Sequence, residues 1–304
     1  MKNLITIMSF FVLGSSFSQL SPIRTQYMFN GIPLNPALTG SEEAWSISGS
    51  FRAQWIGFPG APLTQSLSAH SPLKNESSAI GMQIFADQIG VDRNTGVYGS
   101  YAYRIKMNDA QLSFGLAAGL NLVRSYHSQL STYDSGDQQF SADSPLSILP
   151  NTSFGAYYGS KKFFVSLSIP FMFSNKIENG QNVMTHDPRS YNILLGSGAS
   201  FKVGSKTLLK PSLLMKYNQS ATIQFDVNVM GEFNKFFEAG LSYRTSESII
   251  ALFKINANQQ LSFMYSIGIP MGELMSYSSG SHELGIKYTF LHKTKAQNPR
   301  YLKW

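Results

Sequence analysis

Histidine and serine side chains are the first places to look for chemistry in this chain. The sequence contains five histidines, His70, His127, His186, His282 and His292. No two of them have the spacing of metal ligands, and there is neither a G-x-S-x-G elbow nor a phosphate-binding glycine loop. His70 lies near Ser68 and Ser71, as a general base would beside a nucleophile. The alternation around them favours polar residues that line one face of a strand, so we expect no enzyme, no cofactor and no metal.

Charged side chains form a second group, because they recur on the polar faces of segments that are otherwise apolar. A charge removed from water needs an opposite charge or a polar environment. The mixed signs fit either a water-filled lumen or salt bridges across a lumen, and the sequence leaves both open. These residues are Arg52, Asp87, Arg104, Lys106, Lys210, Lys216, Asp226, Glu232, Glu238, Arg244 and Lys287.

The elements that carry these residues are β-strands, because apolar and polar residues alternate with period two. In residues 112–122, Leu and Phe side chains alternate with Ser, Gly and Asn, and from Trp45 to Trp55 the polar face carries Arg52 and Gln54. About fourteen such segments of ~10 residues occur, the length of a tilted membrane-spanning strand. Their expected spans are 44–55, 64–73, 79–88, 95–107, 110–123, 151–160, 162–171, 190–203, 207–217, 222–234, 236–245, 248–256, 259–270 and 281–291.

Composition and the N-terminus indicate export. Lys2, the apolar run from Leu4 to Leu13 and the small residues Ser16 and Ser18 predict a secretory signal peptide. The chain has no cysteine, and only 13% of its residues are charged, against about 25% in an average soluble domain. A barrel with one face in lipid has such a composition. We therefore expect an all-β fold, a transmembrane antiparallel β-barrel in the outer membrane.

The expected organisation has four parts. Residues 1–18 form the signal peptide, 19–43 an N-terminal segment in the periplasm or plugging the barrel, 44–291 the barrel, and 292–304 a basic periplasmic tail. The stretch QYMFNGIPLNPALTG in the second part contains two prolines and two glycines, which argue against a helix or a long strand. The tail is either a frayed terminus or a docking peptide.

The lengths of the connections support a membrane barrel. The long ones are the fifth, seventh and thirteenth, from Arg124 to Pro150, Met172 to Arg189 and Met271 to Gly280, whereas the even-numbered ones have at most five residues. Outer-membrane barrels have long outer loops and short periplasmic turns. The odd-numbered connections are therefore expected to face the exterior.

The last predicted strand, HELGIKYTF, carries a second indication. Gly285, Tyr288 and Phe290 fit the pattern polar-x-Gly-x-x-aromatic-x-aromatic. This resembles the C-terminal strand by which the outer-membrane assembly machinery receives its substrates. We expect these three residues to act as an assembly signal.

Two further stretches, QYMFNGIPLNPALTG and RAQWIGFPGAP, resemble the signatures of the PorP/SprF family of the type IX secretion system of Bacteroidota. Similar blocks recur at PNTSFGAYYGSKKFFVSLSIPF, KPSLLMKY, AGLSYR and HELGIKYTF, and the ending NPRYLKW is similar to the family's terminal S-P-R-Y-F, with Asn298 and Leu302 as departures. The signature positions are Tyr27, Met28, Phe29, Asn30, Asn35, Pro36, Arg52, Gln54, Trp55, Gly57, Gly60, Ala61 and Pro62.

The resemblance implies a fourteen-stranded barrel without enzymatic activity that helps to export or anchor a cell-surface protein. In the family such partners are adhesins, some of them used in gliding, with type B C-terminal sorting domains. The resemblance also implies contact with periplasmic components of the secretion system and with outer-membrane lipid, and none with nucleic acid. A passive channel, and more remotely a secreted β-sandwich adhesin, are the competing interpretations.

On this interpretation WIGFPGAP is the first outer loop. Glycine and proline fix a compact turn, and Trp55 is expected in an aromatic girdle. Arg52 and Gln54 face the lumen just below it. Two roles stay open for the loop: folding inward to constrict the barrel, with Arg52 bonded to its carbonyls, or contacting the partner's sorting domain.

Overall fold

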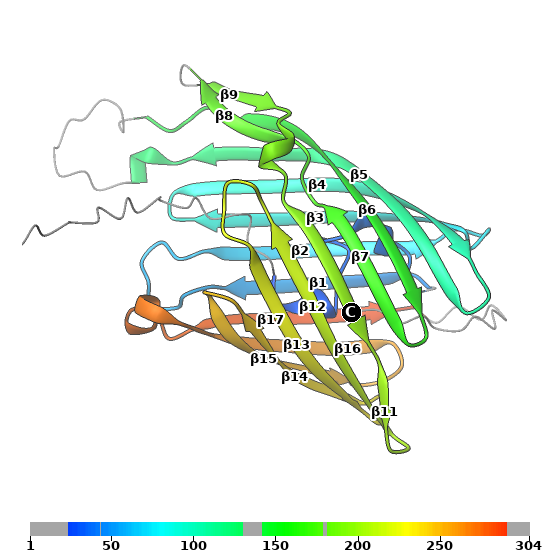
Figure 1. Cartoon of the computed structure of the whole chain (residues 1–304). Helices are drawn as coiled ribbons and strands as arrows, with labels where there is room; N and C mark the ends of the chain where they lie inside the picture. Colours follow the sequence, from blue (N-terminus) through cyan, green and yellow to red (C-terminus); the bar gives the residue numbers. More distant parts are fainter. Residues whose placement is uncertain (1–23, 43, 130–141, 179–180, 291–304) are drawn as a thin grey trace, which may run out of the picture.

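The computed structural model describes residues 24–42, 44–129, 142–178 and 181–290, which form a closed antiparallel β-barrel (Figure 1). Each strand pairs with its sequence neighbours, and β1 (Ser46–Ala53) closes the barrel against β17 (Ser281–Thr289). β10 (Ile193–Ala199) and β11 (Phe201–Val203) are separated by one residue and both pair with β12 (Thr207–Tyr217), so they form one barrel strand. The barrel therefore has fourteen strands, as the sequence predicts.

The remaining strands follow the predicted spans within a few residues. They are β2 (Leu63–Pro72), β3 (Ser78–Ile89), β4 (Asp92–Lys106), β5 (Ala110–Ser125), β6 (Ser147–Ser160), β7 (Phe163–Ile169), β13 (Gln224–Phe233), β14 (Phe237–Arg244), β15 (Ser248–Asn256) and β16 (Leu261–Pro270).

The two faces of the wall have the reverse polarity of a water-soluble protein. On β2, Thr64, Ser66 and Ser68 are buried while Leu63 and Leu67 are exposed. Elsewhere Leu241 is 61% exposed, whereas the guanidinium-bearing Arg244 is 1% exposed. Apolar side chains outside and polar side chains inside are what a lipid-facing barrel requires, because lipid cannot satisfy polar groups.

The connections confirm the predicted parity, and they distinguish the two ends of the barrel. The rim with the odd-numbered connections is called the outer rim below, and the rim with the even-numbered turns and both barrel ends is called the periplasmic rim. Outer connections carry the short helices η3 (His127–Gln129), η4 (Pro188–Ser190) and η5 (Gly272–Ser276), of which η5 is the orange helix at the left of Figure 1. No helix of the described residues has the length and apolarity needed to cross a membrane.

The seventh connection contains an element that the sequence pattern did not predict. A hairpin of β8 (Ser174–Glu178) and β9 (Gln181–Thr185) extends beyond the wall at the outer rim (Figure 1). Its two strands are five residues each, shorter than the ~10-residue segments that identified the barrel strands. A pattern of membrane-length strands therefore does not predict this hairpin.

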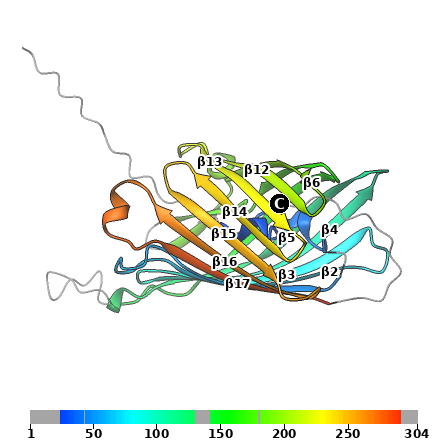
Figure 2. The ribbon, with the colours of Figure 1, turned by 90° about the horizontal axis from the view of Figure 1, so that it is seen from below.

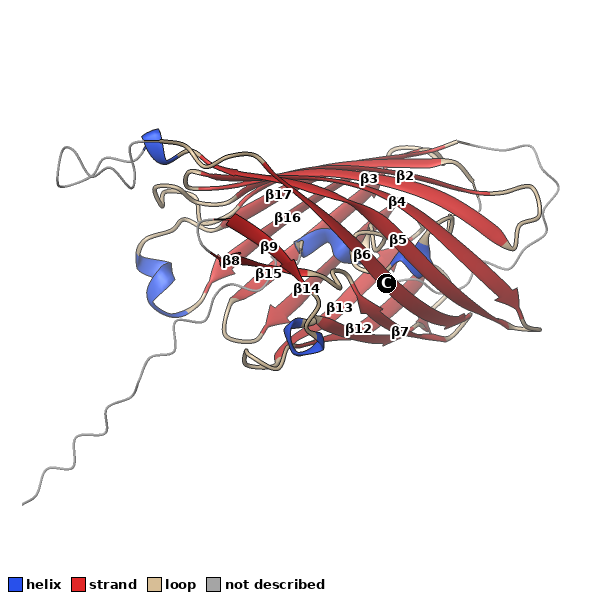
Figure 3. Ribbon diagram, turned by 90° about the horizontal axis from the view of Figure 1, so that it is seen from above, coloured by secondary structure: helices blue, strands red, loops and turns tan. Residues whose placement is uncertain are grey.

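Residues 25–40, which precede β1, lie inside the barrel. They form two 3₁₀ turns, η1 (Thr25–Met28) and η2 (Pro36–Leu38), which Figures 2 and 3 show enclosed by the wall. Residues 25–40, called the lumen segment below, are mostly buried. The predicted signal peptide and basic tail lie outside the described residues.

Candidate functional site

The lumen segment crosses the interior from the outer rim towards the periplasmic rim. Thr25 contacts Glu283, which stands opposite Arg52, one residue from the outer end of β1. At the other end Thr39 contacts Arg104, two residues from the periplasmic end of β4. The signature residues from Tyr27 to Pro36 therefore line a filled lumen, so we treat this interior as the candidate functional site.

Glu283 holds the first residues of the lumen segment. Its Oε2 accepts hydrogen bonds from the backbone N of Thr25 at 2.9 Å and from the Thr25 hydroxyl. The Gln26 side chain donates to the backbone carbonyl of Glu283 at 2.6 Å. Glu283 is 1% exposed, and Arg24 and Arg52 interact with it electrostatically. Two nearby cations thus compensate the buried carboxylate, which makes a charged anchor stable away from water.

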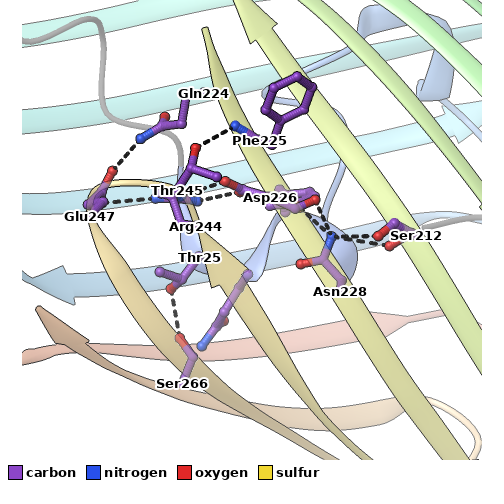
Figure 4. Close-up of polar contacts among 12 residues, drawn as sticks. Thr25, Ser212, Gln224, Phe225, Asp226, Asn228, Arg244, Thr245, Glu247 and Ser266 are labelled. Carbon is purple, nitrogen blue, oxygen red and sulfur yellow. Dashed lines mark hydrogen bonds and ion pairs between the residues drawn. The ribbon is translucent and has the colours of Figure 1, made fainter. Parts of the chain in front are cut away.

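Tyr27 lies beside a second charged group, the pair Asp226 and Arg244 of β13 and β14, whose contacts Figure 4 shows. Its hydroxyl accepts a hydrogen bond from Nδ2 of Asn228 at 2.8 Å. Next to it, Arg244 donates to both oxygens of Asp226, at 2.9 and 2.8 Å, and to Glu247 at 3.2 Å. This bidentate geometry fixes the position of both partners.

The surroundings of Tyr27 keep its hydroxyl neutral. Burial raises the pKa of Tyr27 well above the ordinary value of 10.0, and the negative charge of Asp226 raises it further. Arg244 and the hydrogen bond from Asn228 act in the opposite direction but do not cancel the increase. The phenol therefore stays protonated at physiological pH.

The middle of the lumen segment is apolar. Met28, Phe29 and Leu34 pack in one cluster with buried side chains of the barrel wall, namely Leu194, Leu214, Met230, Ile250, Leu252 and Met264. The ammonium group of Lys254 lies 5.7 Å from the centre of the Phe29 ring. Barrel walls of this kind usually present polar residues inward. The apolar patch on this inner wall is therefore unusual, and it packs against the apolar signature residues Met28 and Phe29.

Asn35 anchors the second half of the lumen segment on β6 and β7. Its Nδ2 donates to the carbonyl of Ala156 at 3.1 Å and to the Ser166 hydroxyl at 2.8 Å. Its Oδ1 accepts from the backbone N of Ala37 at 2.8 Å and so caps η2. The Asn-Pro pair of the signature thus starts a turn and binds the wall with one side chain.

Two glycines make room for this turn. Gly115 on β5 and Gly155 on β6 stand opposite each other in the register. A Cβ atom on Gly115 would lie 2.2 Å from the backbone N of Ala37, and one on Gly155 would lie 1.8 Å from Oδ1 of Asn35. Only glycine lets the wall approach the backbone of η2 this closely.

The last residues of the lumen segment bind residues that resemble catalytic groups in the sequence. The backbone N of Gly40 donates to Nδ1 of His70 at 2.8 Å. Asn30 donates to the hydroxyl of Ser68 at 2.9 Å, and Thr39 bonds Ser100 at 2.9 Å. Ser68 and His70 therefore hold the segment rather than each other, in agreement with the interpretation as lumen-lining residues.

Salt bridges on one side of the lumen answer a question that the sequence left open. Lys210 contacts Glu232 at 2.5 Å and Glu238 at 3.2 Å, and Lys254 contacts Glu238 at 2.7 Å. These pairs connect β12 to β15. Together with Asp226 and Arg244 they link nearby strands, so these salt bridges lie along the wall, whereas one of the two alternatives expected them across the lumen.

Lys106 departs from the expectation of an inward-facing charge. It is the last residue of β4, its side chain is 39% exposed, and it pairs with Glu76 in the adjacent turn at 2.8 Å. The alternation that predicts its direction ends where the strand ends, so this lysine reaches solvent at the periplasmic rim.

The first outer loop is exposed rather than folded into the lumen. Ile56, Gly57, Phe58, Pro59 and Gly60 are all exposed. Trp55 is half-buried with a φ of 45°, in the left-handed region that ends the strand. The described residues that fill the lumen are those of the lumen segment. Constriction by this loop is therefore not seen.

Hydrogen bonds tie the first loop to its neighbours at the outer rim. The backbone N of Ile56 donates to the carbonyl of Gly280 at 2.8 Å, and the backbone N of Ser279 donates to the carbonyl of Ile56 at 2.9 Å. The backbone N of Gly90 donates to the carbonyl of Gly60 at 2.9 Å. Below the loop, the backbone N of Gln54 donates to the carbonyl of Pro62 at 2.9 Å. Within the loop, the backbone N of Ala61 donates to the carbonyl of Phe58 at 3.1 Å. The first, third and thirteenth connections thus form one rim structure.

The terminal strand places its aromatic residues as expected of an assembly signal on the lipid face. Tyr288 and Phe290 are 37% and 43% exposed, and their rings lie 4.8 Å apart in an edge-to-face arrangement. Gly285 faces the lumen, where a Cβ atom would lie 2.4 Å from Oε1 of Gln26. This glycine therefore also makes room for the lumen segment.

A hollow remains beside the middle of the lumen segment. Its volume is about 30 Å³, and its lining includes Ile32, Pro33, Phe85, Tyr98 and Phe171. Among the described residues, no group of three or more His, Asp or Glu side chains could hold a metal ion.

Several residues of the site were not among the sequence candidates. Glu283, Asn228 and the glycines of β5 and β6 hold the lumen segment, yet each looks like an ordinary member of an alternating strand. The available indication was that Gly115 and Gly155 fall on the polar, inward face, where no lipid contact explains a missing side chain.

Comparisons with known proteins agree with this architecture. The family model described as "Type IX secretion system membrane protein PorP/SprF" matches residues 16–288. The search of curated proteins gives no match.

Solved structures show the same fold at low identity. The CymD monoaromatic hydrocarbon channel is 12% identical with a TM-score of 0.53, and the alignment covers 90% of this chain and 94% of that one. The Ralstonia pickettii toluene transporter TbuX is 10% identical with a TM-score of 0.53, over 88% and 94% of the two chains. The outer membrane phospholipase A of Escherichia coli matches with a TM-score of only 0.38, at 9% identity, over 80% and 92%.

Proposed function

Because the chain belongs to the PorP/SprF family of type IX secretion system membrane proteins, we propose that it helps to export or anchor one cognate cell-surface protein while its own lumen stays filled. At the level of the family it is a type IX secretion-associated barrel of the outer membrane. The cognate protein is an adhesin with a type B C-terminal sorting domain, a class that includes gliding adhesins, and it binds at the outer rim.

The observation that carries this proposal is the filled lumen. Contacts of the lumen segment extend from Glu283 near the outer rim to Arg104 near the periplasmic rim. A barrel whose interior is occupied by its own chain supports a role as a membrane platform better than a role as a wide pore. In this function the wall supplies a rigid frame and the outer connections supply the contact surface.

The outer rim offers such a surface in the linked first and thirteenth connections. Ile56 and Phe58 are 41% and 44% exposed, and Met275 and Tyr277 of the thirteenth connection are 64% and 68% exposed. Apolar side chains that gather on a hydrogen-bonded loop pair are typical of protein contact sites. We assign the first loop, with Trp55, Gly57, Gly60, Ala61 and Pro62, to partner contact.

Cell-surface display tests the proposal. The gene is deleted in its host, and the adhesin-like protein encoded beside it is quantified by antibody on intact and on lysed cells. The proposal requires that surface display falls at least tenfold and that the wild-type gene restores it. A variant with Phe58→Ser and Tyr277→Ser should leave the amount of barrel unchanged and reduce display. Normal display in the deletion strain would refute the proposal.

Conductance separates this function from a passive channel. Purified barrel in a planar bilayer should give no steady ion current, because the lumen segment occupies the interior. An open, stable conductance in the wild-type protein would favour the channel interpretation.

A further inference from the structure

The two rims of the barrel carry different charges. At the outer rim, apart from the buried Arg52, Lys216 and Arg244 and the hairpin of β8 and β9, the described connections and strand ends hold the basic residues Arg93, Arg124 and Arg189 against five acidic ones, Asp92, Asp143, Asp187, Glu247 and Glu273. At the periplasmic rim, Glu42, Glu232 and Glu238 pair with Lys287, Lys210 and Lys254. Apart from these pairs and the buried Arg104, the described turns and strand ends there carry lysines and two acidic residues, Glu76 and Asp109. The lysines there are Lys74, Lys106, Lys161, Lys162, Lys202, Lys206 and Lys235.

Only two of these lysines have an acidic partner among the described residues. Lys106 pairs with Glu76 at 2.8 Å, and Lys161 pairs with Asp109 at 2.9 Å. The others, Lys74, Lys162, Lys202, Lys206 and Lys235, are exposed and are called the lysine arc below. They lie in or beside four of the turns between β2 and β14, so their positive charge is spread around most of the rim.

Large apolar side chains accompany the lysine arc. Leu73 precedes Lys74, Phe163 follows Lys162, and Phe236 follows Lys235, with exposures of 39%, 45% and 57%. Phe201 and Val203 flank Lys202 and are 55% and 54% exposed. Each of these lysine-bearing turns thus presents an apolar group to the acyl chains and an ammonium group beside it.

This pairing fits a lipid headgroup better than a protein. Lysine can extend its apolar stem along lipid while its ammonium reaches the headgroup phosphates, and aromatic side chains prefer the same interface. An acidic protein that docked on this rim would meet charge but would also have to cover the exposed phenylalanines. Excess positive charge beside a membrane favours net anionic lipids over zwitterionic ones.

We propose that the lysine arc binds the phosphate groups of anionic phospholipids in the inner leaflet of the outer membrane. Zwitterionic phosphatidylethanolamine also has a phosphate, but its own amine competes with the lysines for it. The arc therefore enriches phosphatidylglycerol around the barrel from β2 to β14. This inference depends on charge and exposure at the periplasmic rim, and it stands whether or not the proposed partner at the outer rim is correct.

Lipid selection by the purified full-length barrel tests this. The protein is reconstituted in nanodiscs of phosphatidylethanolamine with a minor fraction of phosphatidylglycerol, and the lipids that stay bound after mild detergent extraction are quantified by mass spectrometry. We expect phosphatidylglycerol to be enriched roughly threefold or more over the bulk, and the enrichment to fall at high salt because the contacts are exposed.

Two matched variants identify the lysine arc as the cause. Replacement of all five lysines by glutamine should remove the enrichment, and replacement of all five by arginine should keep it. Replacing Arg93 and Arg189 at the outer rim by glutamine should change nothing. Heat-modifiable migration on gels checks that each variant is folded.

Two results would overturn the proposal. One is equal enrichment in the wild type and in the glutamine variant, which would show that the arc does not select lipid. The other is saturable binding of a soluble polyglutamate peptide to the wild-type barrel in nanodiscs of pure phosphatidylethanolamine, if the addition of phosphatidylglycerol to the nanodiscs does not weaken this binding. That result would assign the arc to an acidic polypeptide.

Discussion

The two ends of the lumen segment are held by different means. Near the outer rim, Thr25 and Tyr27 bind side chains that carry or neighbour buried charges, Glu283 and the Asp226–Arg244 pair. Towards the periplasmic rim, Asn35 and η2 lie against space left by glycines and are bound by a single amide side chain. We refer to these as the charged anchor and the glycine anchor.

The difference predicts how each anchor fails. A charged anchor depends on compensation among neighbours, so the loss of one charge weakens it but leaves the shape of the wall intact. A glycine anchor depends on shape, and an added side chain cannot coexist with the bound backbone. The glycine anchor should therefore respond more strongly to a single substitution, and only the charged anchor should respond to pH.

The largest effect is expected from Gly115→Val combined with Gly155→Val. The new side chains would overlap η2 and Asn35, at a cost of about 3 kcal/mol or more for a segment that cannot shift. The segment should leave the lumen, and the barrel should gain a steady conductance in planar bilayers. Gly99→Val is the control, because no heavy atom lies within 4 Å of a Cβ atom at Gly99. Equal conductance in the control and the double variant would contradict the glycine anchor.

A smaller effect is expected from Glu283→Gln. The amide loses the charge that receives the Thr25 hydrogen bonds, and hydrogen bonds to a charged group contribute roughly 1.5–3 kcal/mol. Hydrogen exchange of the Thr25 and Gln26 amides should accelerate by about tenfold or more, while the amide of Ala37 in the glycine anchor keeps its rate. Glu273→Gln on the exposed helix η5 serves as the control. Acceleration at both anchors would mean that the segment is released as one unit.

Arg52 tests whether the charged anchor communicates with the outer rim. It faces Glu283 in the register and lies directly below the first loop. Arg52→Ala and Arg52→Lys should leave the barrel folded, at a local cost of about 2 kcal/mol, and should reduce display of the cognate surface protein. Lysine should not rescue it, because it lacks the planar fork of donors. Wild-type display in both variants, with equal amounts of barrel, would show that Arg52 only fills the lumen.

The smallest effect is expected from Tyr27→Phe, which removes the hydrogen bonds of the phenol hydroxyl with Asn228 and with the Asp226 carboxylate and costs roughly 1.5 kcal/mol. Its diagnostic is pH. The pKa of Tyr27 is raised in the folded barrel, so below pH 10 the phenol is neutral whether the segment is bound or free. Above pH 10 the free phenol ionises first, and binding of the segment weakens as pH rises.

The measurement for Tyr27 is hydrogen exchange of the lumen segment between pH 9 and 11, after correction for the intrinsic exchange rate. Wild type should lose more protection over this range than Tyr27→Phe does. Parallel curves for the two proteins would place the pH sensitivity elsewhere, for instance in the lysines of the wall.

Strand number, strand faces and the positions of the long loops were predictable from the sequence. The alternation that exposes Leu63 and Leu67 and buries Thr64 is a local property, readable two residues at a time. The hairpin of β8 and β9 escaped the same method because its strands are too short to span lipid. Lys106 is expected in the lumen from the sequence because the alternation pattern alone does not show where a strand ends.

The contents of the lumen were only partly predictable. The signature residues Tyr27, Met28, Phe29 and Asn35 were identified through a family resemblance, and the structure places all four against the wall. Their partners were not identified, because Asn228, Glu283 and Gly115 have no distinctive sequence neighbourhood. The charges of the polar faces were recognised, but which of them pair was not.

What the sequence determined by itself was an exported, cysteine-free barrel of fourteen strands with a polar interior, because period-two alternation and connection length act over a few residues. What the tertiary structure decided was that this interior is occupied, and by which contacts. Thr25 and Glu283 are 258 residues apart, and Gly115 meets Ala37 only after β5 has been built into the wall. Closure of the barrel brings such residues together, so no local pattern in the chain can encode which of them touch.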